Sequence, residues 1–184
     1  MTGADALPML ERRRIEATIL KHVYDTLVES HGKEVATRTI ADAVRRSSIE
    51  QARQLAASEP GSETSMRTFI ARQAQWRMGD ALQTETIHES DTAFDFNVTR
   101  CRYAEMYREM GLGEIGHLLS CQRDGTFCEG YDPRLKMERT QTIMQVPVTV
   151  TSAIAGSKQP RFERPQGGLS KGPDLRDPPG IGRG

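Results

Sequence analysis

The chain has 184 residues and a formal net charge of zero, with 36% hydrophobic and 27% charged residues. This length and composition predict one domain with a modest core, and the balanced charge gives no reason to expect nucleic acid or an anionic membrane as partner. No run approaches the roughly 18 apolar residues of a membrane span, and the N-terminus lacks the order of a signal peptide. Three cysteines, an odd number, predict free thiols in the reducing cytoplasm.

The first half of the chain predicts helices. One helix begins at Pro8 and ends at Gly32, and a second spans about residues 34–57. A loop at residues 58–63 contains a Pro-Gly pair, and a third helix spans about residues 64–82. Apolar side chains at helical spacing support the three helices: Leu10, Ile15, Ile19, Val23, Leu27, Val28; Val35, Ile40, Val44, Ile49, Leu55; Met66, Phe69, Ile70, Trp76, Met78.

The second half predicts strands with short helices between them. Residues 84–90 and 92–99 read as two strands around a turn near Ser90, and residues 135–146 as another strand. Residues 104–111 and 113–122 read as short helices broken by glycines. The fold class is therefore α+β, with the N-terminal long helices packed on a small, mostly antiparallel sheet and short helices inserted.

Two segments follow from this division. Residues 1–155 form the single expected domain. Residues 156–184 are rich in glycine and proline and have few aliphatic side chains, so they cannot bury enough apolar area to offset the entropy of ordering. We expect this tail to be disordered.

The segment with the most chemistry begins at the end of a strand. Phe94, Phe96 and Val98 alternate as in a half-buried strand, and the chain then reaches Cys101 between Arg100 and Arg102. Neighbouring cations favour the thiolate, which is the reactive form of cysteine.

Residues 97–124, 129–133 and 139–145 resemble the L-2-amino-thiazoline-4-carboxylic acid hydrolase family, and residues 7–32 are similar to it more loosely. The resemblance implies a cytoplasmic hydrolase that cleaves a C–N or C–S bond of a cyclic amidine, on a route to cysteine. It implies a small-molecule substrate and no cofactor.

After Gln145 the chain departs from the family pattern, which continues roughly Gly-Ala-Ser-His-Cys-Asp-Phe-Arg-Tyr-Arg. Written as GGT GCC AGT CAC TGT GAC TTC CGC TAT CGC and read without its first G, that pattern becomes Val-Pro-Val-Thr-Val-Thr-Ser-Ala-Ile-Ala. These are residues 146–155 in order. One missing nucleotide thus explains the segment, and a frameshifted C-terminus would remove a histidine, a cysteine and an aspartate. The replacement is β-prone, so it can still pair as a strand, with Pro147 interrupting one hydrogen bond.

Ring opening needs a base for the water, a cation for the substrate carboxylate and, on a covalent route, a nucleophile. The candidate catalytic residues are Cys101, His117, Cys121 and Asp124. His117 and Cys121 are four residues apart, which puts them on one face of a continuous helix, and Asp124 matches an aspartate of the family motif. The alternative to a catalytic role is a structural one: each cysteine would be a packed thiol, and the aspartate would belong to a turn or a helix cap.

The candidate substrate-binding residues are Asn97, Arg100, Arg139 and Thr140. Asn97 and Arg100 match the family motif, and an asparagine is unfavourable in a strand unless its side chain has a local role. Arg139 and Thr140 suit a carboxylate clamp, although a solvated strand face explains them as well.

Three further readings stay open. A metal site formed by Cys101, His117, Cys121 and Asp124 is weakly indicated, because only the His117–Cys121 spacing is metal-like, so we predict no metal. The alternative function is a small-molecule binding domain without catalysis. A frameshifted, inactive relative of the hydrolases is the third reading, and the oligomeric state is left open.

Overall fold

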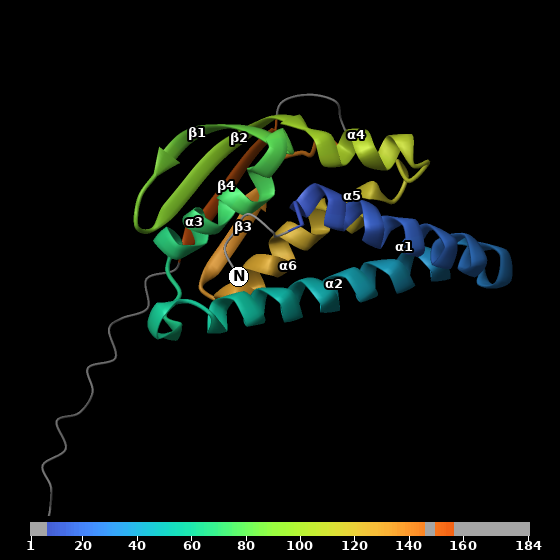
Figure 1. The fold of residues 1–184 in the computed structure, drawn as a ribbon, viewed down its shortest axis with the longest axis horizontal. Helices are drawn as coiled ribbons and strands as arrows, with labels where there is room; N and C mark the ends of the chain where they lie inside the picture. Colours follow the sequence, from blue (N-terminus) through green and yellow to red (C-terminus); the bar gives the residue numbers. More distant parts are fainter. Residues whose placement is uncertain (1–6, 146–149, 157–184) are drawn as a thin grey trace, which may run out of the picture.

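The computed structural model describes residues 7–145 and 150–156. Figure 1 shows a twisted sheet with helices packed beneath and beside it. The sheet is antiparallel and has the order β1-β2-β4-β3. Its strands are β1 (Leu82–Glu89), β2 (Ala93–Cys101), β3 (Leu135–Arg139) and β4 (Val150–Gly156). The predicted α+β class is confirmed.

Two long helices, α1 (Met9–His31) and α2 (Lys33–Ala57), form an antiparallel hairpin whose turn lies at one end of the molecule, and α2 runs beneath α6 (Cys121–Tyr131), which lies nearer to the sheet (Figure 1). The other helices are α3 (Met66–Arg77), α4 (Arg102–Glu109) and α5 (Gly116–Leu119), with short 3-10 turns at Pro60–Ser62 and Met78–Asp80. Within the described residues no helix is long and apolar enough to cross a membrane.

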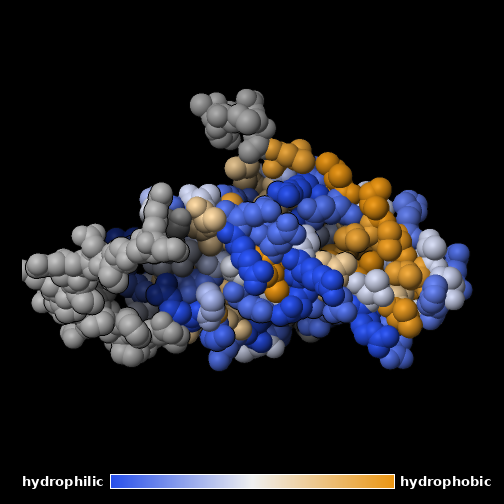
Figure 2. Space-filling view, turned by 90° about the horizontal axis from the view of Figure 1, so that it is seen from below, coloured by the Kyte–Doolittle hydropathy of each residue, from blue (hydrophilic) through white to orange (hydrophobic). Residues whose placement is uncertain are grey.

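Helix α1 is present as predicted, but only part of its apolar stripe faces the core: Leu10 is buried, and Leu27 and Val28 pack against the core. Ile15, Ile19 and Val23 are 41–63% exposed, whereas the buried positions include Leu10, Arg13 and Ala17. Figure 2 shows hydrophobic side chains gathered on the surface at the end of the molecule formed by α1 and α2. A buried arginine therefore takes a core position while isoleucines face outward.

Helix α6 extends past the predicted helix at residues 113–122 into a segment for which no helix is predicted, although Gly125 and Gly130 disfavour one. Close packing on α2 explains one of these glycines: a Cβ at Gly130 would lie 2.6 Å from the carbonyl oxygen of Ile49. The facing positions of α2, Ser48 and Ala52, are also small and fully buried. Tertiary packing thus overrides the local preference of the chain.

The strand ends differ from the predicted ranges. The strand predicted at residues 135–146 ends at Arg139, and the helix predicted at 64–82 ends at Arg77. Strand β4 forms within the segment that departs from the family pattern, and Ile154 is fully buried opposite Phe94 of β2. The pairing expected for this segment is confirmed there, while Pro147 and the tail 157–184 lie outside the described residues. Gly156, assigned to the tail, is the last residue of β4.

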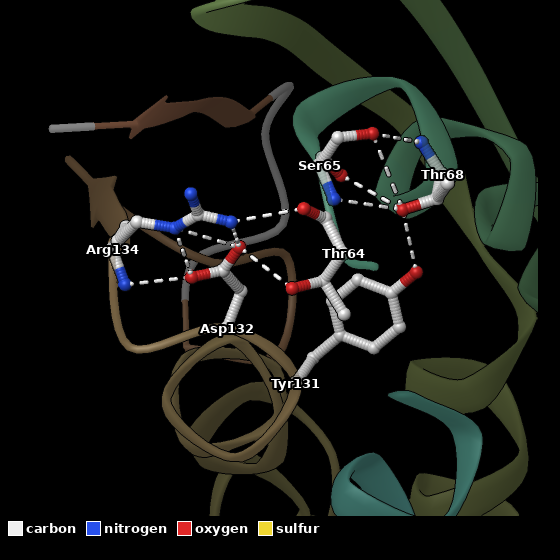
Figure 3. Close-up of polar contacts among 6 residues, drawn as sticks. All are labelled: Thr64, Ser65, Thr68, Tyr131, Asp132 and Arg134. Carbon is white, nitrogen blue, oxygen red and sulfur yellow. Dashed lines mark hydrogen bonds and ion pairs between the residues drawn. The ribbon is translucent and has the colours of Figure 1, made fainter. Parts of the chain in front are cut away.

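A buried polar network joins the end of α6 to the start of α3 (Figure 3). Asp132 accepts hydrogen bonds from the hydroxyl of Thr64 and from the guanidinium of Arg134, which also donates to the carbonyl oxygen of Thr64. The hydroxyl of Tyr131 lies 2.7 Å from Glu59 and 2.8 Å from Thr68. We call this the Asp132 network; it comprises Glu59, Thr64, Ser65, Thr68, Arg72, Tyr131, Asp132 and Arg134.

Every ionised group of the network has an opposite partner. Glu59 pairs with Arg72 at 2.7 Å and Asp132 with Arg134 at 2.6 Å. Ser65 and Thr68 form a reciprocal capping box at the start of α3. Since its groups satisfy one another, the network has the features of a structural element.

Candidate functional site

A pocket lies between the inner face of the sheet and helices α1, α3, α4 and α6. Its volume is about 90 Å³. An enclosed water molecule occupies about 10–15 Å³ of such a volume, so the pocket has room for a small molecule of several non-hydrogen atoms. Its walls are mostly apolar and aromatic, and they include Phe69, Trp76, Phe96, Val98 and Phe127.

The pocket brings together four of the predicted site residues: Cys101, Cys121, Asp124 and Arg139. They come from the end of β2, the first two turns of α6 and the end of β3. The sequence separates them by up to 38 positions, so the fold alone makes them neighbours.

A bulge in β2 aims Cys101 into the pocket. Gln83 of β1 pairs with Arg100, but the next residue, Thr84, pairs with Val98, so Thr99 is an extra residue in β2. Strand side chains alternate between faces, and one extra residue reverses the alternation. Phe96 and Val98 line the pocket, and the bulge makes Cys101 rather than Arg100 the next side chain to do so.

Neither pocket thiol has the environment of a thiolate. Burial raises the pKa of Cys101, and the helix-start amide of Ala104 opposes this without outweighing it. Burial and the charge of Asp124 raise the pKa of Cys121 to about 12. The cations flanking Cys101 are engaged elsewhere: Arg100 with Glu105 at 2.9 Å, and Arg102 with the carbonyl oxygen of Gly79. The prediction that these arginines stabilise a thiolate at Cys101 is therefore wrong.

Asp124 and Arg139 form an ion pair of 2.8 Å inside the pocket. Arg139 also donates to the backbone oxygen of Cys121, which ties β3 to the start of α6. The Asp124 side chain is 41% exposed, so its carboxylate is held in orientation and remains accessible to a ligand or to water. This geometry suits a general base, which must be both positioned and reachable.

Four predicted site residues do not line the pocket. Asn97 is between Phe96 and Val98 and so faces the opposite side of β2, and Thr140 is exposed after the end of β3. Arg100 is turned outward by the bulge. His117 belongs to α5, which ends at Leu119, and Ser120 has non-helical backbone angles before α6 begins. The prediction that His117 and Cys121 share one helical face is therefore wrong, because no continuous helix joins them.

Two arginines of the pocket were missed from the sequence. Arg13 of α1 and Arg123 of α6 both line it, and they are only 4% and 6% exposed. A signal for Arg13 was present, since it falls between Leu10 and Ala17 at helical core spacing, where a cation is unusual. Arg123 directly precedes Asp124 in the motif, and its position next to a candidate residue did not by itself indicate a place in the pocket.

Among the described residues, no cluster of three or more histidine, cysteine, aspartate or glutamate side chains could hold a metal ion. The proposed set of Cys101, His117, Cys121 and Asp124 is not gathered, because His117 does not line the pocket with the other three.

The profile of the L-2-amino-thiazoline-4-carboxylic acid hydrolase family matches residues 12–145. The chain belongs to this family. The match contains all four predicted residues of the pocket together with Arg13 and Arg123, and it stops at the residue before the divergent segment. No curated protein matches the chain.

Solved structures similar to the chain include the crystal structure of the phenol-responsive sensory domain of the transcription activator PoxR with phenol. The two are 9% identical, with a TM-score of 0.47, and the similarity covers 78% of this chain and 74% of that one. A likeness of this degree assigns no ligand to the pocket.

Proposed function

We propose that the chain binds L-2-amino-thiazoline-4-carboxylate, or a closely related cyclic amidine carboxylate, in this pocket and opens its ring with water. The supporting observation is that Asp124, held by Arg139, meets the thiols of Cys101 and Cys121 in one pocket within the region that defines the family. The substrate has about nine non-hydrogen atoms, a size compatible with this volume.

The proposed reaction has two steps. A water oxygen bonds to the ring carbon between sulfur and nitrogen while Asp124 accepts a proton from that water. The tetrahedral adduct then collapses to a carbamoyl C=O as either the C–N or the C–S ring bond breaks. The proton held by Asp124 and the proton of the adduct hydroxyl both end on the ring nitrogen after C–N cleavage, or one on nitrogen and one on sulfur after C–S cleavage. The product is cysteine carrying a carbamoyl group on sulfur or on nitrogen, respectively. Water as nucleophile suits the pocket because burial keeps both thiols protonated at neutral pH.

The substitution Asp124→Asn tests this role. We expect a loss of turnover of about a hundredfold or more, with substrate binding retained. A matched control is Glu129→Gln, because Glu129 is on the same helix in an exposed ion pair with Arg45. Mass spectrometry of the product would identify the bond that breaks, and wild-type turnover by the Asp124 variant would refute the role of this residue.

The divergent segment is part of the same proposal. The family match ends at Gln145, and under the frameshift hypothesis one missing nucleotide would explain residues 146–155. We propose that the chain acts in the cytoplasm on a route to cysteine, and we expect it to be a poor catalyst although β4 keeps the sheet intact. Genomic DNA around codons 144–156 tests the frameshift directly. Restoring the frame should raise turnover by about a hundredfold or more, and equal turnover by the two proteins would contradict the proposal.

Binding without turnover is the second candidate. The two protonated thiols and the position of His117 outside the pocket favour it. Calorimetric binding of the amidine carboxylate by the wild-type chain, with no product released on prolonged incubation, would select this candidate over hydrolysis.

A further inference from the structure

The pocket contains a cluster of arginines whose charge is not balanced. Arg13, Arg123 and Arg139 line the pocket. Asp124 pairs with Arg139, whereas Arg13 and Arg123 share Glu16, so that two guanidiniums face one carboxylate among the described residues. Glu16 is further divided, because it also accepts a hydrogen bond from Arg12 at 3.3 Å.

Arg13 and Arg123 come from different helices and converge on the same two acceptors. Arg13 donates to Glu16 at 2.6 Å and to the side-chain oxygen of Gln51 at 3.1 Å. Arg123 donates to the same two side chains at 3.5 and 3.4 Å, and to the backbone oxygen of Leu119 at 3.4 Å. We call Arg13 and Arg123 the arginine pair.

The hydrogen bonds of Arg123 are all at the long limit. Charged N–H donors normally reach carboxylates at about 2.7–2.9 Å. A guanidinium this deeply buried is costly unless it is paired and well hydrogen-bonded. Burial, together with the charge of Arg13, lowers the pKa of Arg123 to about 10. The charged form of Arg123 is therefore less favourable inside the folded protein than in water.

Arg139, the clamp predicted from the sequence, is a weaker candidate for an incoming anion. Its guanidinium already binds Asp124 at 2.8 Å. Within the part of the chain that the structure describes, the arginine pair has no ion-pair partner other than the shared Glu16. A ligand carboxylate would supply both the missing negative charge and two oxygens that suit planar guanidiniums.

We propose that the arginine pair is the anion subsite of the pocket and takes the carboxylate of the ligand, with Glu16 and Gln51 holding the two guanidiniums in position. This inference rests on the proposed function for the identity of the ligand. The substrate class is then a small cyclic monocarboxylate whose ring lies against the aromatic walls, Phe96 and Phe127 among them. A neutral analogue of the same ring would lose this anchor.

The test is calorimetric binding of L-2-amino-thiazoline-4-carboxylate and of its methyl ester to the full chain. We expect the wild type to prefer the acid, and Arg123→Met and Arg13→Met each to weaken acid binding by about tenfold to a hundredfold. Ester binding should not change in these variants. Arg45→Met is the matched control, because Arg45 of α2 is in an exposed pair with Glu129 of α6 and does not line the pocket, so its loss should leave acid binding unchanged.

A second measurement needs no variant. The acid should raise the melting temperature of the wild type more than the ester at equal concentration. Equal binding of acid and ester by the wild type would overturn the proposal, as would acid binding insensitive to both substitutions. If the amidine acid fails to bind but other small cyclic carboxylates bind with the same arginine dependence, the subsite stands and the proposed substrate fails. Loss of turnover in Asp124→Asn with binding intact likewise leaves the subsite in place.

Discussion

Helix α6 carries a buried polar cluster at each end, and the two clusters differ in how completely their charges are paired. At its C-terminal end, the Asp132 network matches each carboxylate with one guanidinium at 2.6–2.7 Å. At its N-terminal end, the arginine pair shares a single glutamate, and every bond of Arg123 is 3.4 Å or longer. Polar groups that satisfy one another stabilise a fold, whereas an underpaired buried charge is tolerated where a ligand completes it.

The pKa shifts in the two clusters follow the same division. A hydrogen bond from Arg72 lowers the pKa of Glu59, and that of Asp132 is lowered by its contacts with Arg134 in spite of burial. Both groups are thus more stable as ions inside the protein than outside it. Arg123 shows the reverse, because burial lowers its pKa and so disfavours its charged form.

The largest effect on stability is expected from Asp132→Asn. The change leaves the guanidinium of Arg134 without its carboxylate and weakens the tie between α6 and α3. We expect a loss of about 2–3 kcal/mol in the free energy of unfolding, below the usual range for a fully buried pair because Arg134 is half-exposed. Urea denaturation measures it. Asp91→Asn is the control, since its pair with Arg67 is fully at the surface and should contribute much less to stability. Equal losses would contradict a structural role for the network.

Gly130→Ala is expected to have the next largest effect on stability. It tests whether close packing of α6 on α2 is needed to hold the two clusters in place. The added Cβ would meet the backbone of Ile49, which cannot move aside as a flexible side chain can. We expect a loss of about 1–3 kcal/mol by urea denaturation. Gly125→Ala, on the same helix with no atom within 4 Å of its added Cβ, should instead gain about 0.5–1 kcal/mol from helix propensity. A gain at both positions would show that α6 does not depend on close approach to α2.

The sequence predicts the long helices and the β1–β2 hairpin well, because their periodicity and turn residues are local features. It fails at α6, where Gly130 is explained only by contact with α2. It also fails for the buried face of α1, where Ile15 and Ile19 are exposed while Arg13 is buried. Helical spacing puts Arg13 among core positions, but whether Arg13 and Arg123 can be buried depends on partners 3 to 107 residues away.

The candidate site was predicted in part for a related reason. Cys101 was predicted from its flanking arginines, Cys121 from its spacing to His117, Asp124 from the family motif and Arg139 as a carboxylate clamp. All four meet in one pocket. Asn97 and Arg100 belong to the same motif but do not line it, because strand alternation and the bulge at Thr99 turn them away. Proximity in a motif does not determine on which face of a strand a residue lies, and a bulge is invisible in the sequence.

Acid denaturation sharpens the comparison through the Asp132 network. Carboxyls with a lowered pKa in the folded state stabilise it above their unfolded pKa values, ordinarily 4.5 for glutamate and 3.8 for aspartate, and lose this contribution as the pH falls through the folded values. We expect the free energy of unfolding to be steady down to about pH 5 and to decline below about pH 4.5. Glu59→Gln should make this decline shallower. An unchanged acid slope in that variant would mean that other carboxyls dominate.

The smallest effect on stability is expected from Arg123→Met, and it is the change that can break the comparison. If Arg123 were a structural group like Asp132, its loss would cost several kcal/mol, because Glu16 and Gln51 would lose a buried partner. We expect instead a free energy of unfolding within about 1 kcal/mol of wild type, or above it, since methionine fills similar space without a buried charge and Glu16 keeps Arg13 at 2.6 Å. Urea denaturation without ligand measures this, and Arg123→Lys, which keeps the charge but not the planar fork, should show no gain. A loss above about 2 kcal/mol in Arg123→Met would place the arginine pair with the structural clusters and remove the physical reason for treating its missing charge as a binding site.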